Sequence, residues 1–170
     1  GDKEDKRVLL YSMLCNSAAV GETIVGNPMD TAIWEYAIKA GEQDSAAPYT
    51  KVHEIPFDYQ RRTMSVIVKN DDNYTLITKG APESIFSRCK YADISGKIMP
   101  IDSVKEAVND KFFKLSELGY RILAVGGRQT DFKSSYSVED EKDLTLLGFL
   151  IFTDPPKMDA HEAIDRLKQM

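Results

Sequence analysis

The sequence predicts an α+β fold in which a mostly antiparallel, twisted sheet is flanked by helical hairpins. Residues 64–69 and 74–79 are rich in β-branched side chains and are separated by Asn-Asp-Asp-Asn, which is typical of a β-hairpin. Helices interrupt the predicted strands without the regular strand–helix–strand alternation that favours a parallel sheet. The 170 residues are enough for one domain with a substantial core.

The hairpin has a predictable register. If residues 70–73 form the loop, Lys69 pairs with Tyr74 and Met64 pairs with Lys79. Side chains alternate between the two faces, so Arg62, Met64, Ile77 and Lys79 share one side. Two cations beside a thioether predict a site on this side and not a core, although a slip of one residue would reverse the faces.

The first helices are predicted from apolar spacing and from end signals. Residues 7–15 carry the apolar spacing of a helix with one buried face, and the small residues in 17–26 predict a loop. Asn27 is the expected N-cap of the next helix, Pro28 its first residue and Gly41 its end.

The chain before the hairpin is predicted to be extended. Residues 43–49 are polar and predict a linker, and residues 51–55 predict a strand. Pro56 is expected to break this strand, so that Phe57 projects from the entry of the hairpin.

The second half begins with a short helix at residues 83–89, preceded by Pro82. Ser95-Gly96 predicts a turn between two short extended segments. Ser103 and Glu106 match a capping box, which predicts the start of a helix that ends at Gly119.

The rest of the chain contains two expected strands and a final helix. The apolar run at its centre predicts a strand buried on both faces, which Asp-Pro-Pro then ends. In order, the segments are a strand at 120–125, a bulge or bend at Gly126 and Gly127, a polar excursion at 131–143, the central strand at 145–153 and an amphipathic helix from 159.

Composition argues against several classes of protein. There are 22 basic and 27 acidic residues, a net charge of −5, which argues against nucleic-acid binding. Cys15 and Cys89 are too few for a disulfide scaffold and lack metal-ligand spacing, so two reduced thiols are expected. Neither a bilayer-length apolar run nor a signal peptide is found in the sequence.

The sequence offers no catalytic or metal-binding motif. GxxxxGKS/T and a strand-linked GxGxxG are absent, and Asp71-Asp72 lies in a predicted turn where solvation explains both carboxylates. The two His residues, His53 and His161, are far apart in sequence. We therefore expect no catalytic residue and no metal ligand.

The hairpin and its approaches favour a ligand site. The aromatic ring of Phe57, a glycine that allows close approach at Gly80, and nearby cations can hold a base by its face and a phosphate by its charge. The alternative is an ordinary hairpin with Phe57 buried and the cations solvated.

A resemblance favours the ligand site. The stretches VGNPMDTAI, FDYQRRTMSV with KGAPE, GYRILAV and LGFLIFTDPPK occur in this order across residues 25–157. They resemble the nucleotide-binding domain of P-type cation-transporting ATPases. The resemblance implies a nucleotide-binding domain at 1–153 and, at 154–170, a hinge and the start of the phosphorylation domain.

The resemblance also implies what this chain does and what it lacks. The phosphorylated aspartate of DKTGT and the magnesium ligands of GDGxND are absent from the sequence. We expect the chain to bind ATP without hydrolysing it, and Mg²⁺ to be held by the full-length enzyme and not by this domain. The expected partners are an adenine nucleotide and the phosphorylation and actuator domains of a pump. The domain is expected to be a monomer at the cytoplasmic face of a membrane, touching neither lipid nor nucleic acid.

Eight residues match the nucleotide site of the family. Their implied roles are an acceptor for the adenine amino group (Asp30), the stacking ring (Phe57), a cation near the phosphates (Arg62), a wall (Met64), the pocket floor (Lys79), close approach (Gly80), a ribose and β-phosphate contact (Arg121) and a contact to the base (Leu123). Asp30 also suits the first turn of its helix, where a carboxylate stabilises the helix dipole. Tyr59 replaces a basic residue of many calcium pumps, and Asn27 replaces the first acidic residue of a GEATE-like motif.

The transported ion is expected to be divalent. IPFDYQRR and GFLIFTDPPK are most similar to magnesium-transporting pumps, whereas KGAPESIFSRC is equally similar to calcium-transporting pumps. We expect Mg²⁺ ahead of Ca²⁺; the His-Pro motif of heavy-metal pumps is absent. Two alternatives remain open: a free-standing adenine-nucleotide sensor, and a protein-binding module anchored by Phe57.

Overall fold

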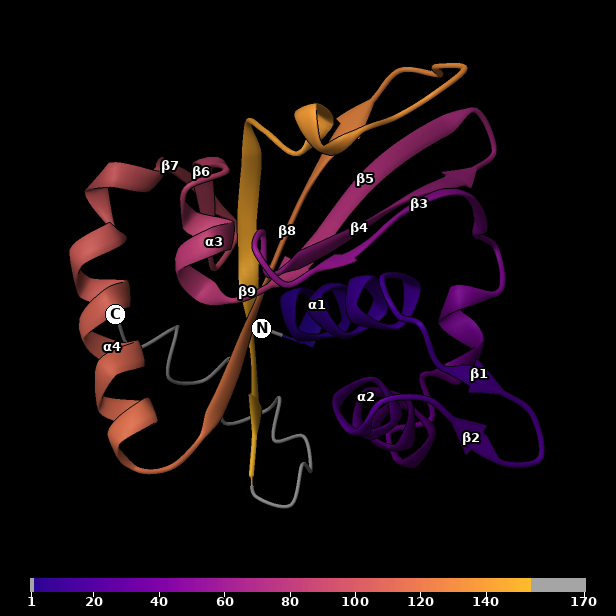
Figure 1. Cartoon of the computed structure of the whole chain (residues 1–170), viewed down its shortest axis with the longest axis horizontal. Coiled ribbons are helices and arrows are strands. Elements are labelled where there is room, and N and C mark those ends of the chain that lie inside the picture. The colour runs from indigo at the N-terminus through magenta and orange to yellow at the C-terminus, as the bar shows by residue number, and fades with distance from the viewer. Residues whose placement is uncertain (1, 154–170) are drawn as a thin grey trace.

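A twisted seven-stranded sheet runs through the middle of the protein (Figure 1). The computed structural model describes residues 2–153. The strand order is β3-β4-β5-β8-β9-β6-β7, and within the described residues only the β6–β9 pair is parallel. The strands are β3 (Thr50–Asp58), β4 (Thr63–Asn70), β5 (Asn73–Gly80), β6 (Cys89–Ile94), β7 (Lys97–Pro100), β8 (Arg121–Thr130) and β9 (Leu144–Phe152). The predicted α+β fold with a mostly antiparallel sheet is confirmed.

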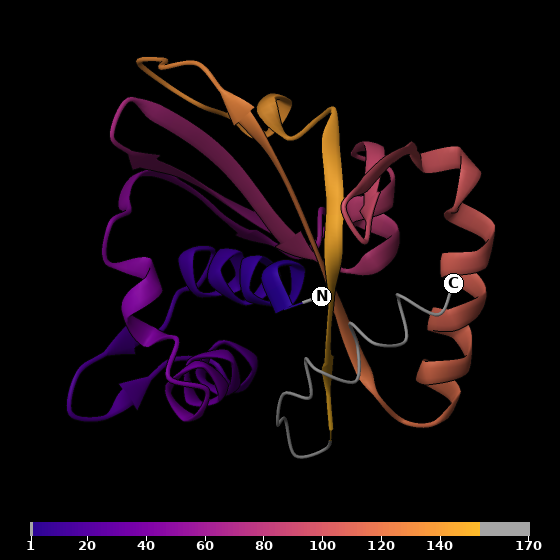
Figure 2. The ribbon, with the colours of Figure 1, turned by 180° about the vertical axis from the view of Figure 1, so that it is seen from behind.

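Helices flank the sheet in two groups, which both views separate clearly (Figures 1 and 2). One group lies beside the β3-β4-β5 half, and the other lies near β6 and β7. The helices are α1 (Asp2–Leu14) and α2 (Pro28–Lys39) in the first group, and α3 (Pro82–Phe86) and α4 (Lys105–Glu117) in the second. Within residues 2–153, no helix is long and apolar enough to cross a membrane.

The hydrophobic core has two main clusters that meet at β9. Leu150 and Phe152 belong to the cluster under α1 and α2, whereas Phe149 and Ile151 belong to the cluster under α3 and α4. Because alternate side chains enter different clusters, both faces of β9 are buried, which requires a nearly continuous apolar run. The expected central strand is confirmed.

The β4–β5 hairpin has the predicted register but a shorter loop. Met64 pairs with Lys79, and the ladder continues to a pair between Asn70 and Asn73. The prediction of a four-residue loop is therefore wrong: two residues make the turn, and Asp71 has a φ of +53°. Tight hairpin turns require positive φ, which Asp tolerates better than most residues.

The second long helix begins as predicted, and the loop before it has structure of its own. The Asn27 side chain accepts a hydrogen bond from the Asp30 N–H at 2.9 Å, and Gly41 follows the helix with a φ of +71°. The predicted loop at 17–26 contains a two-stranded ladder made of β1 (Ala19–Val20) and β2 (Ile24–Val25). Part of the predicted linker at 43–49 is a short 3₁₀ turn, Gln43–Ala46.

The predicted strand break at Pro56 is wrong. β3 continues to Asp58, with an irregular register against β4 between Ile55 and Asp58. β3 is an edge strand, where proline removes no hydrogen bond that the sheet needs. Phe57 therefore lies within the last residues of the strand.

The predicted capping box at the start of α4 is also wrong. Val104 is the N-cap and makes no side-chain hydrogen bond, while the Ser103 hydroxyl donates to the Pro100 carbonyl at 2.7 Å. A capping box does occur within the polar excursion, where Ser137 and Asp140 cap a 3₁₀ turn. Two predicted bounds are too short: α1 begins at Asp2 and not at Arg7, and β8 continues to Thr130 and not only to Val125. The predicted bulge or bend at Gly126 and Gly127 agrees with a register shift between Val125 and Gly126. The expected hinge and final helix lie outside the described residues.

Both cysteines should be unreactive in the folded protein. Burial raises the pKa of the Cys15 and Cys89 thiols to about 12, so at pH 8 the thiolate is on the order of one part in 10⁴. We expect thiol titration with Ellman's reagent at pH 8 to be slowed by a factor of about 10³ or more, and both thiols to react at once in guanidinium. Rapid reaction of either thiol without denaturant would contradict the burial of that residue.

Candidate functional site

The predicted site residues gather at one end of the sheet. Asp58, Thr63 and Gly80 form a row of paired residues across β3, β4 and β5. Phe57 directly precedes the first member of this row, and Lys79 directly precedes the last. Neighbouring strands are antiparallel, so the end of β3, the start of β4 and the end of β5 meet here.

The start of β8 extends this end of the sheet. Lys79 of β5 pairs with Val125 of β8, and both lie toward the core cluster under α2. Side chains alternate along β8, so Leu123 and Arg121 share the face of Val125. Leu123 packs against that cluster, and Arg121 pairs with Phe152, another of its members. The structure thus brings Arg121 and Leu123 to the same face as Lys79.

A buried ion pair joins α2 to the sheet. The Lys79 ammonium donates to Asp30 Oδ1 at 2.6 Å, and the two side chains are only 4% and 5% exposed. The other carboxylate oxygen of Asp30 accepts from the Ser17 N–H at 2.9 Å and from the Asn27 amide at 3.0 Å. Charges so far from water require such partners.

The ion pair keeps some capacity for further hydrogen bonds. A carboxylate has about four acceptor positions and an ammonium has three donors. Among the described residues, Asp30 uses three acceptor positions and Lys79 one donor. One acceptor and two donors therefore remain beside each other.

Met64 and Gly80 have structural explanations of their own. Met64 is 5% exposed and belongs to the core cluster, so the prediction that this side of the hairpin is a site and not a core is wrong in part. A Cβ on Gly80 would lie 2.3 Å from the Arg62 carbonyl oxygen and 2.8 Å from Thr63 Cα. The backbone of β4 thus requires glycine here, whether or not a ligand approaches.

Arg62 lies in the turn before β4 and faces solvent. Its φ is +57°, and its guanidinium forms an ion pair with Glu83 at 2.7 Å, in which both side chains are half exposed or more. Such a pair stabilises the fold by about 0–1 kcal/mol at most. Arg62 can therefore exchange Glu83 for another anion at little cost.

Two exposed aromatic rings lie at the end of β3 and in the turn that follows it, a region called the rim of the site below. Phe57 is 52% exposed and Tyr59 is 89% exposed, and their ring centroids lie 5.3 Å apart in an edge-to-face arrangement. The alternative of a buried Phe57 is excluded. An exposed aromatic face at the end of a strand is free to stack on a flat ligand.

Sequence reasoning missed the neighbour that holds this rim. Arg61 Nη2 donates to the Pro56 carbonyl at 2.9 Å, and Arg61 Nε lies 2.7 Å from Oε1 of the buried Glu141. The adjacent arginines in the sequence were visible as a pair. No pattern in the neighbouring residues indicated that Arg62 faces solvent whereas Arg61 faces the carboxylate of Glu141, 80 residues later in the sequence.

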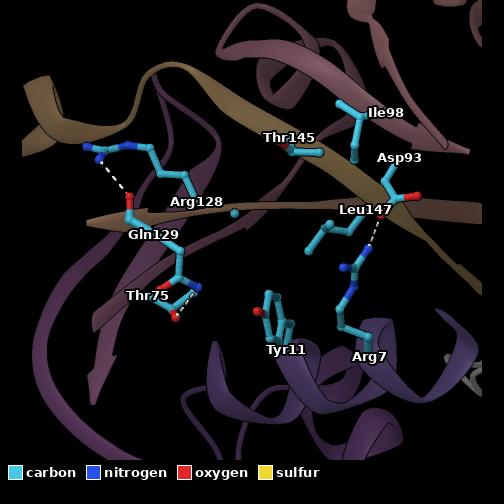
Figure 3. Close-up of a pocket in the computed structure, with 10 residues that line it drawn as sticks. Arg7, Tyr11, Thr75, Asp93, Ile98, Arg128, Gln129, Thr145 and Leu147 are labelled. Atoms are coloured by element: carbon cyan, nitrogen blue, oxygen red, sulfur yellow. Dashed lines mark hydrogen bonds and ion pairs between the residues drawn. The ribbon is translucent and has the colours of Figure 1, made fainter. Parts of the chain in front are cut away.

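A cavity of about 190 Å³ lies elsewhere, between α1 and the middle of the sheet (Figure 3). Arg7 and Asp93 form an ion pair of 2.6 Å at one side of it, and Gln129 donates to Thr75 at 3.2 Å at the other. Burial raises the pKa of Tyr11, which lies between them. None of the eight predicted residues lines this cavity, and Thr75 lies toward the opposite end of β5 from Lys79.

No group of three potential metal ligands lies together in the part of the chain that the structure describes. The groups at the strand ends are instead the exposed ring of Phe57, the exposed cations Arg62 and Arg121, and a buried ion pair. This combination suits a flat, polar and anionic ligand better than a metal ion.

Comparison with known proteins gives a consistent family. The family model described as P-type ATPase, cytoplasmic domain N, matches residues 5–159. The chain is 34% identical over 172 residues to the magnesium-transporting ATPase, P-type 1, of Escherichia coli (strain K12), covering 98% of this chain and 18% of that protein. It is 30% identical over 172 residues to calcium-transporting ATPase 1 of Lactococcus lactis subsp. lactis (strain IL1403), covering 97% of this chain and 20% of that protein. The chain therefore spans about a fifth of the length of these relatives.

The buried ion pair predicts a strong energetic coupling. Lys79→Met leaves the Asp30 carboxylate buried without its cation, which should lower the free energy of unfolding by about 3–5 kcal/mol. The double variant Asp30→Asn/Lys79→Met removes both charges and should be clearly more stable than the Lys79→Met variant. Urea unfolding of both singles and the double variant measures the coupling.

The exposed pair of Arg62 and Glu83 is the matched control for that experiment. Arg62→Met should change the free energy of unfolding by no more than about 1 kcal/mol. Additive effects of Asp30→Asn and Lys79→Met would show that the two side chains do not depend on each other.

Proposed function

Because the chain belongs to the P-type ATPases, as their cytoplasmic domain N, we propose that it binds ATP by the adenine base at this end of the sheet. The observation that carries the proposal is the juxtaposition of an exposed ring, Phe57, with the buried pair of Asp30 and Lys79. The ring can hold the face of a base, and the pair can contact its edge.

The edge of adenine suits the donors and acceptor that the ion pair retains. Adenine presents an amino donor beside a ring-nitrogen acceptor, whereas guanine presents two acceptors at the corresponding positions. Asp30 has one acceptor position left for the amino group, and Lys79 has donors left for the ring nitrogen. Guanine would place its carbonyl against the Asp30 carboxylate, acceptor against acceptor.

The cations at the rim are proposed to hold the phosphates. Arg62 releases Glu83 and pairs with a phosphate, which is favoured because a phosphate carries more charge than a carboxylate. Arg121 lies on the same face of the sheet as Lys79, but unlike Lys79 it is exposed. It is proposed to contact the ribose and β-phosphate. Leu123 and Met64 are proposed to contact the base as apolar walls. Lys79 is proposed to form the floor of the pocket, and Gly80, which has no side chain, to let the nucleotide approach the backbone closely.

The γ-phosphate is proposed to remain free. The sequence lacks the aspartate motif that such pumps phosphorylate, so an aspartate on another domain would receive the phosphoryl group. The chain is then a nucleotide carrier at the cytoplasmic face of a pump, working with phosphorylation and actuator domains. Mg²⁺ is proposed to be held by the full-length enzyme.

The parent protein is proposed to transport a divalent cation across a membrane. One relative is named as magnesium-transporting at 34% identity, and another as calcium-transporting at 30% identity. We place Mg²⁺ ahead of Ca²⁺ on this basis and on the stretches IPFDYQRR and GFLIFTDPPK.

Removing the ring tests the proposal directly. Phe57→Ala should weaken ATP binding by about 1–3 kcal/mol, the usual loss for one base–aromatic stack. The fold should survive because the side chain is 52% exposed. Calorimetry or an NMR titration measures the affinity, and circular dichroism checks the fold.

Phe132→Ala is the matched control, since Phe132 is also exposed but lies near the opposite end of β5, against Tyr74. It should leave the affinity for ATP unchanged. Equal affinities for the Phe57→Ala variant and the wild type would exclude Phe57 as the stacking ring and would favour a protein-binding surface instead.

A nucleotide series tests which part of ATP is recognised. A base-centred site should bind ATP with a Kd of roughly 0.1 to a few mM, about −3.5 to −5.5 kcal/mol. AMP, ADP and ATP should differ by about tenfold at most, GTP should bind more weakly than ATP, and magnesium should not be required. NMR titrations with and without magnesium provide the measurement. Tight, magnesium-dependent ATP binding that AMP cannot displace would show a phosphate-centred site.

A further inference from the structure

We propose that Glu141 is a positioning residue for the nucleotide site. Through Arg61 it holds the carbonyl of Pro56 and so fixes the backbone from which Phe57 projects. The inference rests on the proposed function, in which Phe57 stacks on the base, but the contacts that carry it are properties of the free domain.

Glu141 has the environment of a structural anchor. It directly precedes the loop into β9, and its side chain is fully buried. Ser65 of β4 donates to Oε2, and Thr78 of β5 lies 2.6 Å from the Ser65 hydroxyl, so Thr78 donates to Ser65 in turn. Arg88 Nε lies 3.9 Å from Oε1. The carboxylate is therefore tied to the middle of the sheet.

The backbone on both sides of Glu141 is held as well. The guanidinium of Arg128 donates to the carbonyl of Asp140 at 2.9 Å and to the carbonyl of Lys142 at 3.0 Å. Lys133 pairs with the Asp140 carboxylate at 2.5 Å. A residue clamped before and after its own position has little freedom to follow a moving partner, so Glu141 can act as a fixed point.

Arg61 connects this fixed point to the rim. Its side chain is only 11% exposed, and its Nε lies 2.7 Å from Glu141 Oε1 in an ion pair without hydrogen-bond alignment. The attraction is therefore that of two opposite charges away from water, which depends on the full charge of both groups. Arg61 Nη2 donates at the same time to the Pro56 carbonyl at 2.9 Å.

The backbone at Phe57 needs this support. Register pairs between β3 and β4 stop at Ile55 and resume at Asp58, and Pro56 in between has no N–H to donate. Arg61 holds the carbonyl just before Phe57, and the Asp58 side chain just after it accepts from the Gln60 and Arg61 N–H groups at 2.7 and 3.0 Å. The segment that carries the exposed ring is therefore held by side-chain hydrogen bonds, because the strand ladder is interrupted there.

Arg61→Lys separates positioning from general stability. Lysine keeps a charge for Glu141, but its N–H donors all lie on one nitrogen, so it lacks the separate Nη2 with which Arg61 reaches the Pro56 carbonyl. We expect the affinity for ATP to fall roughly fivefold to tenfold in the Arg61→Lys variant, and by at least as much in Glu141→Gln. In a Phe57→Ala background, the same substitutions should change the affinity by less than about twofold, since there is no ring left to position.

Asp93→Asn provides the matched control. It weakens the ion pair with Arg7, of 2.6 Å, at the cavity near α1, away from the strand ends that carry Phe57. It should lower the urea midpoint and leave the ATP affinity unchanged. If Glu141→Gln does not fold, the cycle of Arg61→Lys with Phe57→Ala decides alone. Losses of affinity that persist in full in the Phe57→Ala background would overturn the positioning role.

A second readout does not depend on ATP binding. In the nucleotide-free wild type, the Phe57 amide should have an NMR order parameter near that of rigid backbone, about 0.85, falling toward about 0.6 in Arg61→Lys. An unchanged order parameter would count against the inference even if the wild type binds ATP. The two proposals can also fail separately. If the wild type binds no ATP, but the order parameter of Phe57 still falls in the Arg61→Lys variant, the proposed function is refuted and the positioning contact stands.

Discussion

The ion pair of Asp30 and Lys79 fixes how the first helices meet the sheet. Both charges are almost completely removed from water, so each depends on the other and on the Ser17 N–H and the Asn27 amide. This requirement ties the start of α2 and the segment after α1 to the end of β5. The same pair retains an acceptor and donors near the strand ends that carry Phe57. One electrostatic constraint thus stabilises the packing and defines the polar part of the candidate site.

The other candidate residues depend on how firmly their strands are held. Leu123 lies on an interior strand and Met64 is packed in the core, so the sheet itself positions them. Phe57 differs, because a ring that must remain open to a ligand cannot be immobilised by burial. It lies on an edge strand where the ladder is interrupted. Arg61 and Glu141 provide rigidity there by contacts that do not involve the ring, which stays half exposed.

The accuracy of the sequence predictions follows how local each signal is. The register that pairs Met64 with Lys79 depends on alternation and on a turn within the same hairpin, and it was predicted correctly. The capping box at Ser103 failed because Ile101–Ser103 forms a 3₁₀ turn that the pattern did not show, so the helix begins later and Val104 is its N-cap. The break at Pro56 failed because the sequence does not say which strand lies at the sheet edge, where proline is tolerated.

The sequence by itself determined the α+β class, the hairpin register, the N-cap at Asn27, the central apolar strand and the family. All of these depend on neighbours within a few residues or on motifs that stand intact in the chain. Only the tertiary structure decided that Lys79 is buried against Asp30, that Arg61 faces a carboxylate while Arg62 faces solvent, and that Glu141 lies beneath the rim. The physical reason is that burial and charge pairing depend on which distant segments exclude water from a side chain, and no local pattern records that.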